Sequence, residues 1–190
     1  MIRFLDFDRT LFDTDAYLAS LPDEPACAPF REELLQTLAS KREESVSGGE
    51  ARIAVWDKVS EAIRSGALSF APGYLSRFLY ADTLETLRAY GNEAIIVSYG
   101  EKERQRVKIE SALAGVVRLT VLYTGMESKA EFLSKWPGYY GASAVLVDDR
   151  PSELEALASA LPALSLYEMR RDNGKGDGRW PVIHTLADLP

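Results

Sequence analysis

Two aspartates near the N-terminus, Asp6 and Asp8, are spaced so that their carboxylates could act together in a reaction. The apolar residues Ile2, Phe4 and Leu5 precede them and predict a buried strand. Because side chains alternate along a strand with a period of two, both carboxylates would leave its end on the same side. Like charges held that close persist only where a cation, a proton or a catalytic task compensates them. A solvated turn after an edge strand also accounts for this stretch taken alone.

Further polar residues follow apolar runs later in the chain. Ser98 ends one such run, and the pair Asp148 and Asp149 ends another. Lys129 opens a predicted helix between them. In parallel sheets, ligands bind outside the carboxyl ends of the strands, so these side chains are expected at one edge. Each has an ordinary structural explanation by itself, but the set in this order favours a single chemical site.

The chemistry that these residue types suit is the binding of a divalent cation and a phosphate. Oxygen ligands without His or Cys favour Mg²⁺. The predicted metal ligands are Asp6, Asp8 through its backbone carbonyl, and one or both of Asp148 and Asp149. A phosphate oxygen could complete the metal shell, with Ser98 and Lys129 binding other oxygens of the phosphate.

The elements that would position these residues form an α/β pattern. After the first strand, predicted strands lie at 94–97, within 116–123, at 144–147 and, as the last one, at 164–169. Helices alternate with them, and Asp82 to Glu85 and Ser128 to Glu131 each have the form of a capping box. Apolar strands alternating with helices predict a Rossmann-like, doubly wound parallel sheet that is covered on both faces.

A helical block is predicted between the first strand and the rest of the sheet. Residues 14–81 show no convincing strand pattern, and apolar residues recur there at helical spacing. The predicted organisation is an α/β core of residues 1–13 plus 82–190 with an inserted helical segment of residues 14–81. Arg52, Trp56 and Lys58 could contact a ligand, but nothing in the sequence marks them above a surface or core role.

Composition bounds the class of protein. The 190 residues, 46% hydrophobic and 27% charged, suit one core with a modest insertion. A net charge of −7 disfavours nucleic acid and anionic membranes as partners. Without an apolar run of membrane-spanning length or a signal-peptide pattern, a cytoplasmic location is expected. Cys27 and His184, the single residues of their types, rule out a disulfide framework and a His or Cys metal cluster.

The sequence resembles the haloacid dehalogenase-like (HAD) superfamily in four motifs. The matches are, in order, Asp6-Phe7-Asp8-Arg9-Thr10, Ser98, Lys129 and Asp148-Asp149. The first and fourth motifs are the most specific, and Lys135 is a weaker alternative for the third. Arg9 stands where the family often has Gly.

The resemblance implies a Mg²⁺-dependent phosphatase acting on a small phosphorylated metabolite. Asp6 would attack phosphorus and form an aspartyl phosphate. Asp8 would act as general acid and then as general base, and its presence favours phosphate esters over the haloacids of the dehalogenases. Thr10 would brace the turn. The inserted helices would be a small C1-type cap that closes over the site.

Two other functions fit the same residues. One is a phosphotransferase or phosphomutase of the same fold, which passes the phosphate to an acceptor other than water. The other is a non-catalytic protein that binds a phosphate compound or a partner. The sequence does not indicate the substrate or the oligomeric state.

Overall fold

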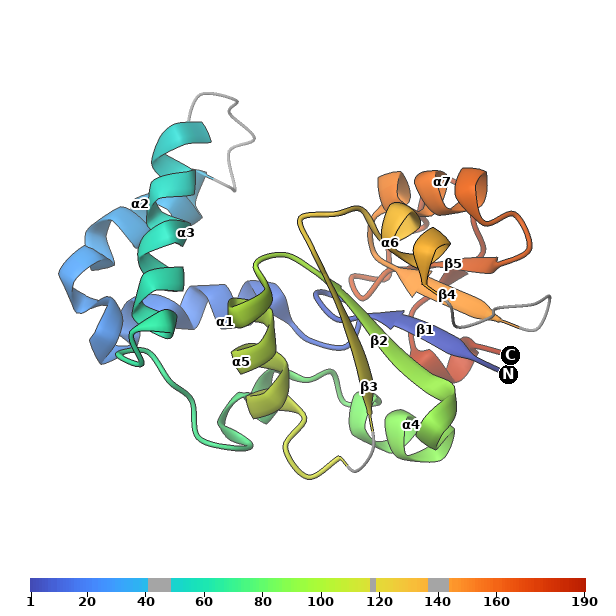
Figure 1. Ribbon diagram of the computed structural model, residues 1–190, viewed down its shortest axis with the longest axis horizontal. Coiled ribbons are helices and arrows are strands. Elements are labelled where there is room, and N and C mark those ends of the chain that lie inside the picture. The colour runs from blue at the N-terminus through green and yellow to red at the C-terminus, as the bar shows by residue number, and fades with distance from the viewer. Residues whose placement is uncertain (41–48, 117–118, 137–143) are drawn as a thin grey trace.

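A six-stranded parallel sheet forms the centre of the computed structural model, which describes residues 1–40, 49–116, 119–136 and 144–190 (Figure 1). The strands are β1 (Arg3–Asp6), β2 (Ala94–Tyr99), β3 (Thr120–Gly125), β4 (Val145–Asp148), β5 (Ser165–Met169) and β6 (Val182–Ile183). Their order is β3-β2-β1-β4-β5-β6, and every neighbouring pair is parallel. The predicted α/β class is confirmed. The strand order reverses between β1 and β4, which is where ligands bind in such sheets.

Helices cover both faces of the sheet because each strand alternates its side chains between two cores. Phe4 of β1 packs on one face with α6 (Lys129–Lys135) and α7 (Pro151–Ala160). Leu5 packs on the other face with α4 (Thr83–Tyr90) and α5 (Lys102–Ala112). Figure 1 shows α6 and α7 above the sheet and α4 below it. Both side chains are fully buried, and each burial contributes about 1.5–3 kcal/mol.

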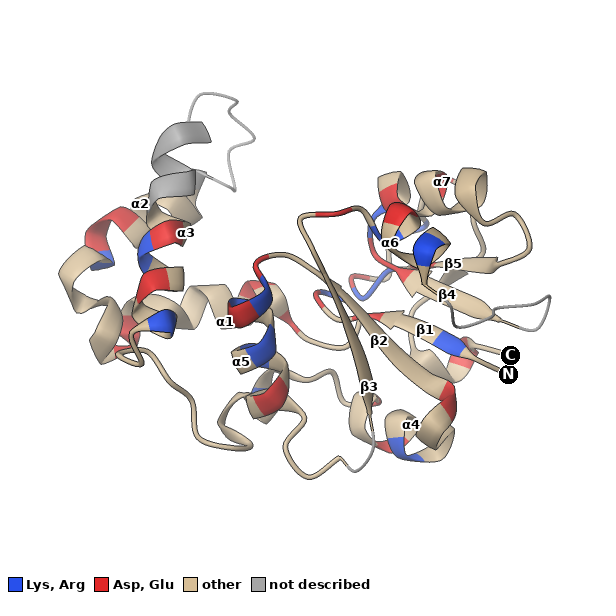
Figure 2. Cartoon of the chain, in the orientation of Figure 1, with Lys and Arg blue, Asp and Glu red and all other residues tan. Residues whose placement is uncertain are grey.

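The segment between β1 and α4 is helical. It contains α1 (Thr14–Ser20), α2 (Arg31–Ser40) and α3 (Gly49–Arg64), which extend away from one end of the sheet (Figure 1). Short 3-10 turns at Leu21–Asp23, Pro25–Phe30 and Tyr74–Phe78 link them. Acidic and basic residues are interspersed along α3 and α5 (Figure 2). None of the described helices is both long and apolar enough to cross a lipid bilayer.

The structure corrects two of the predictions. Asp82 makes no capping bond to α4; its carboxylate accepts hydrogen bonds from Arg171 at 2.9 Å and from the Leu186 amide at 2.7 Å. The run at 164–169 is not the last strand, because β6 follows it and pairs with β5. Ser128 does cap α6, since its hydroxyl accepts from the Glu131 amide at 3.1 Å. Part of the predicted strand region, residues 117–118, lies outside the described residues.

Candidate active site

The turn after β1 holds the first motif in a fixed shape. The amides of Leu11 and Phe12 both donate to the Phe7 carbonyl, at 3.0 and 3.1 Å. Arg9 has a φ of 60°, a left-handed conformation that is easy for Gly and strained for other residues. This explains why a Gly suits the position in the HAD motif. Here the amide of Arg9 donates to the Phe12 carbonyl at 2.8 Å, and its guanidinium pairs with Asp15 at 2.8 Å.

Three carboxylates converge where β1 and β4 end. Oxygens of Asp6, Asp148 and Asp149 all lie within 4.8 Å of one another. Burial raises the pKa of Asp6 well above its usual range, although Lys129 opposes the shift. Burial and the neighbouring Asp148 raise the pKa of Asp149 to about 6. One oxygen of Asp6 is buried and has no hydrogen-bond partner among the described residues. This donor set fits a Mg²⁺ ion.

Lys129 forms ion pairs with two carboxylates of this cluster. Its ammonium group is fully buried and donates to Asp6 and, at 2.6 Å, to Asp148. Burial would lower the pKa of Lys129, but the two carboxylates outweigh burial and raise it. Lys135, the weaker alternative, is exposed and pairs with Glu127 and Glu131 instead. The structure therefore brings Lys129, and not Lys135, to the acidic cluster.

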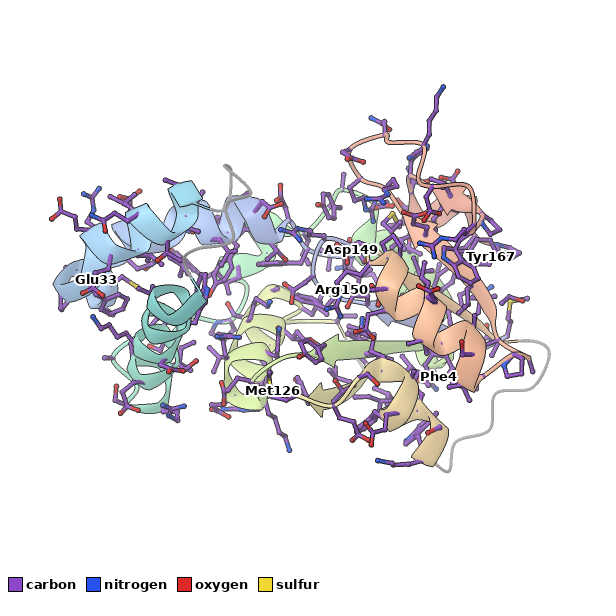
Figure 3. All side chains as sticks on the ribbon, turned by 90° about the horizontal axis from the view of Figure 1, so that it is seen from above. Phe4, Glu33, Met126, Asp149, Arg150 and Tyr167 are labelled. Atoms are coloured by element: carbon purple, nitrogen blue, oxygen red, sulfur yellow. The ribbon has the colours of Figure 1, made fainter. Side chains whose placement is uncertain are left out.

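A small cavity opens above the cluster. We call it the acidic cavity; its volume is about 180 Å³, and its lining is Asp6, Asp8, Arg9, Thr14, Tyr99, Asp149 and Arg150. In Figure 3, Asp149 and Arg150 lie between the inserted helices and the body of the core. The Arg150 guanidinium stacks 5.1 Å from the centre of the Tyr99 ring and pairs with Glu153 at 3.3 Å. Ser98 does not line this cavity.

Ser98 occupies the strand next to Asp6. It follows Val97, which pairs with Asp6 in the sheet. Its hydroxyl is buried and has no hydrogen-bond partner within the described part of the chain. Contact between Ser98 and a phosphate stays a prediction. Thr10 is also fully buried, and its carbonyl accepts two hydrogen bonds from Arg171, at 2.7 and 3.0 Å.

The carboxylate of Asp8 has partners of its own and does not belong to the group of three. It accepts hydrogen bonds from Lys108 at 2.5 Å, Thr14 at 2.5 Å and Gln105 at 3.0 Å. Burial alone would raise the pKa of Asp8, but the charge of Lys108 and the three hydrogen bonds lower it to about 2. The predicted role of the Asp8 carbonyl as a metal ligand stays a prediction.

Sequence analysis missed these partners of Asp8. Lys108 and Gln105 lie on α5 and are both buried. The Lys108 ammonium also lies 5.4 and 5.6 Å from the ring centres of Phe7 and Phe12. The available signal was the spacing of three between Gln105 and Lys108, which places both on one face of a helix. In a helix with many charged residues, the same spacing is also found on a face that is exposed to solvent, so it does not show that Gln105 and Lys108 are buried.

A second cavity separates α5 from the inserted helices. We call it the interhelix cavity; its volume is about 260 Å³, and its lining is Asp8, Thr14, Tyr17, Leu18, Leu21, Trp56, Val59, Arg104, Gln105 and Lys108. Asp8 and Thr14 line both cavities, so the two cavities are neighbours on either side of these side chains. Of the three side chains that the sequence suggested for ligand contact, Trp56 lines this cavity. Lys58 pairs with Glu33 at 2.6 Å, and the Arg52 side chain lies outside the described residues.

Solved structures share this architecture over nearly the whole chain. A candidate haloacid dehalogenase-like hydrolase from Burkholderia xenovorans is 22% identical, with a TM-score of 0.65 over 99% of this chain and 94% of its own. The fold is that of the haloacid dehalogenase-like hydrolases. The magnesium-bound form of the candidate hydrolase YfnB from Bacillus subtilis is 14% identical, with a TM-score of 0.60 over 99% of this chain and 96% of its own.

A third similar structure is a candidate beta-phosphoglucomutase from Thermotoga maritima. It is 14% identical, with a TM-score of 0.55 over 96% of this chain and 94% of its own. No protein-family model matches the sequence, and no curated protein matches it. At these identities the likeness shows the fold, and the chemistry has to be argued from the site.

Proposed function

We propose that this protein is a Mg²⁺-dependent phosphatase that hydrolyses a small phosphorylated metabolite through an aspartyl-phosphate intermediate. The observation that carries the proposal is the convergence of Asp6, Asp148 and Asp149 within 4.8 Å, beside the buried Lys129. Three carboxylates still leave a negative excess beside the Lys129 ammonium and the Arg150 guanidinium, which lies 3.8 Å from Asp148, and a divalent cation would balance it. The haloacid dehalogenase-like fold supports the same chemistry.

Asp6, Asp148 and Asp149 would hold the metal, together with the carbonyl of Asp8. Once bound, Mg²⁺ would neutralise charge on the phosphate and make phosphorus easier to attack. Lys129 fixes one oxygen of Asp6 and leaves the other without a partner among the described residues. This arrangement orients the carboxylate, and it keeps positive charge beside the place where negative charge develops.

Asp6 is the proposed nucleophile. One of its carboxylate oxygens forms a bond to phosphorus while the bond from phosphorus to the ester oxygen breaks. Water then attacks the phosphorus of the aspartyl phosphate, releases inorganic phosphate and restores the Asp6 carboxylate. Ser98 and Lys129 are the proposed contacts of the phosphate oxygens.

Asp8 is the proposed proton carrier. In the first step its carboxyl group gives a proton to the departing ester oxygen, and in the second it takes a proton from the attacking water. Lys108, Thr14 and Gln105 hold Asp8 in its ionised form, which is the form that the second step requires. Before the first step Asp8 must gain a proton, which weakens its attraction to Lys108.

The inserted helices have a proposed role as a cap. Residues 14–81 would form the cap and residues 1–13 plus 82–190 the catalytic core. Asp8 and Thr14 line both the acidic cavity and the interhelix cavity, so the inserted helices lie next to the site and would shield the reacting phosphate from bulk water and contact the leaving group.

Hydrolysis of 4-nitrophenyl phosphate tests the proposal. We expect turnover with Mg²⁺, loss of turnover with a chelator, and a fall in kcat of about 10³-fold or more in Asp6→Asn, because the nucleophile is removed. Asp57→Asn, an exposed change on α3, is the matched control and should keep full activity. Acid quenching of the reaction followed by mass spectrometry should find one phosphoryl group on the peptide that contains Asp6.

Other outcomes would contradict the proposal. Full activity of Asp6→Asn would exclude the aspartyl phosphate. Transfer of the phosphoryl group to an added sugar in preference to water would identify a phosphotransferase or phosphomutase. If a broad panel of phosphate esters gave no turnover while one ester and Mg²⁺ together raised the Tm, the protein would be a binding protein.

A further inference from the structure

We propose that the leaving group of the substrate carries a second anionic group, which Arg104 binds in the interhelix cavity. The substrate would then be a phosphomonoester with a small apolar body and an oxyanion at the end away from the ester. This inference rests on the proposed function and names the substrate class that the site would take.

The walls of the interhelix cavity are apolar on the side of the inserted helices. Tyr17, Leu21 and Val59 are buried there, and Trp56 is half-buried. The volume of about 260 Å³ is below the roughly 300–1,000 Å³ of cavities that take drug-sized ligands. The cavity therefore suits a small body such as a single ring or a short branched chain.

Two cations on α5 line the cavity, and they differ in their partners. Lys108 is matched by Asp8, with which it forms an ion pair. Arg104 has no carboxylate within 4.0 Å among the described residues; its guanidinium makes a long hydrogen bond of 3.4 Å to Ser60 and lies 5.9 Å from the Trp56 ring. By contrast Arg106, on the same helix, pairs with Glu103 and Glu110 at 2.5 and 2.7 Å.

A half-buried guanidinium beside apolar walls is stabilised by an anion, and its fork of donors matches a carboxylate or a phosphate. The protein has an excess of seven negative charges, yet it places none of its described carboxylates at this guanidinium. A ligand that supplies the anion would complete the pair. Both a carboxylate and a phosphate can pair with a guanidinium, so the experiment includes one ester with each of these anions.

The two cavities suggest how the substrate would be oriented in the site. Asp8 lines both cavities, so a phosphoryl group in the acidic cavity would place its ester oxygen beside Asp8 and its leaving group in the interhelix cavity. Arg104 lines the interhelix cavity and is not in the lining of the acidic cavity, so it would then meet the leaving group and not the phosphoryl group. The position of the second anion within the substrate would thus determine specificity.

Three aryl esters of similar size test this inference: phenyl phosphate, 4-carboxyphenyl phosphate and 1,4-phenylene bisphosphate. We expect a kcat/KM for one or both anionic esters that is about tenfold or more above that for phenyl phosphate, mainly through a lower KM. Arg104→Gln should abolish this preference, because kcat/KM should fall about tenfold or more for the preferred anionic esters and much less for phenyl phosphate. Arg106→Gln, the matched control on the same helix, should keep the preference. Which anionic ester is preferred identifies the anion.

Reversing the charge of Arg104 gives an independent test. Arg104→Glu should shift the preference toward 4-(aminomethyl)phenyl phosphate, a change that a general loss of structure would not produce. Equal kcat/KM values for all esters in the wild type, or an equal loss for every ester in Arg104→Gln, would overturn the inference.

Failure of the proposed function is recognised separately. If the wild type hydrolysed none of the esters, the phosphatase proposal would fail. The rise in Tm on binding each ester would then show whether Arg104 binds a second anion. In that case a larger rise in Tm with 4-carboxyphenyl phosphate or the bisphosphate than with phenyl phosphate, lost in Arg104→Gln, would support the inference. Equal rises in Tm would overturn it.

Discussion

Asp8 and Lys108 form an ion pair of 2.5 Å that is largely shielded from water, with 7% of the Lys108 side chain and 29% of the Asp8 side chain exposed. Burial lowers the pKa of Lys108, and the Asp8 carboxylate beside it opposes that shift. The pKa of Asp8 falls from 3.8 to about 2. Because this carboxyl has a lower pKa in the folded state, ionised Asp8 contributes stability above about pH 4, and that contribution is lost as the pH falls toward 2.

Replacing Lys108 tests this pair. Lys108→Met leaves Asp8 partly buried without its cation, so we expect the free energy of unfolding at pH 7 to fall by about 1–3 kcal/mol, less than for a fully buried pair because Asp8 is partly exposed. The loss should be smaller at pH 3, where Asp8 of the variant is protonated. Urea unfolding at both pH values with a chelator present measures it. Arg106→Met is the control, and an equal loss at both pH values would point to packing instead of charge.

Asp149 shows the opposite shift, with a pKa of about 6 caused by burial and by Asp148. A carboxyl whose pKa is higher in the folded state makes the protein less stable as the pH rises from about 4 to 6. Without metal we therefore expect Asp149→Asn to be more stable than the wild type at pH 7, by about 1–3 kcal/mol, and the gain to shrink at pH 5.

Magnesium should stabilise the wild type more than Asp149→Asn if Asp149 is a metal ligand. Mg²⁺ would raise the Tm of the wild type more than that of Asp149→Asn, because the variant has lost one carboxylate of the site. Thermal unfolding with a chelator and then with Mg²⁺ measures both effects, with Asp57→Asn as the control. An identical rise in Tm for wild type and Asp149→Asn would show that Asp149 does not bind the metal.

At the scale of elements, α5 supplies two hydrogen-bond partners of Asp8 and lines the interhelix cavity. Glu101 caps it by accepting from the amides of Glu103 and Arg104, at 3.2 and 2.8 Å. The cap sets where the helix begins, and the helix turns Gln105 and Lys108 toward Asp8. The composition of this stretch predicted a helix, but it could not show which charged face is buried. That depends on α3, which packs against α5 from a distant part of the sequence.

The strand ends were the predictable part of the site. Apolar runs mark β1, β2 and β4 clearly; Asp6 and Asp148 end β1 and β4, and Ser98 follows the apolar run of β2, one residue before that strand ends. A parallel sheet then brings those ends to one edge, so the acidic cluster followed from local pattern and topology together. Lys129 was found because Ser128 caps its helix.

Other features depended on long-range partners. Asp82 has the local pattern of a capping residue, yet Arg171, which is 89 positions away, provides a better partner than the helix amides do. The two-residue strand β6 is too short to show a period. Partners of Asp8 on α5 are about 100 positions away, and a charged residue on a helix is more often solvated than buried.

At the scale of the whole molecule, the chain crosses twice between the core and the inserted helices, and the two crossings are joined. The amide of Asp13 donates to the Phe78 carbonyl at 2.7 Å, and the amide of Tyr80 donates to the Leu11 carbonyl at 3.1 Å. The first crossing lies a few residues after Asp8, and the second is hydrogen-bonded to the first. Any movement of the inserted helices relative to the sheet would therefore bend the chain next to the site.

Arg171 ties this region to the C-terminal part of the chain. It donates to the Thr10 carbonyl, to Asp82 at 2.9 Å and to the His184 carbonyl at 3.2 Å, and it stacks 4.4 Å from the Tyr80 ring centre. One side chain thus holds the motif turn, the second crossing and the segment after β6. The chain termini also lie together, as Figure 1 shows.

Removing Arg171 should loosen all three segments at once. We expect Arg171→Met to lower the free energy of unfolding by about 2–4 kcal/mol, because it leaves the mostly buried Asp82 carboxylate without its cation and the buried Thr10 carbonyl without the donors on Arg171. In a double-mutant cycle with Asp82→Asn, measured by urea unfolding, the two changes should be coupled by about 1 kcal/mol or more, since each removes the same contact. Hydrogen exchange should quicken at the amides of Tyr80 and Leu186. Purely additive losses, with unchanged exchange at these amides, would show that Arg171 contributes packing only and does not hold the crossings in place.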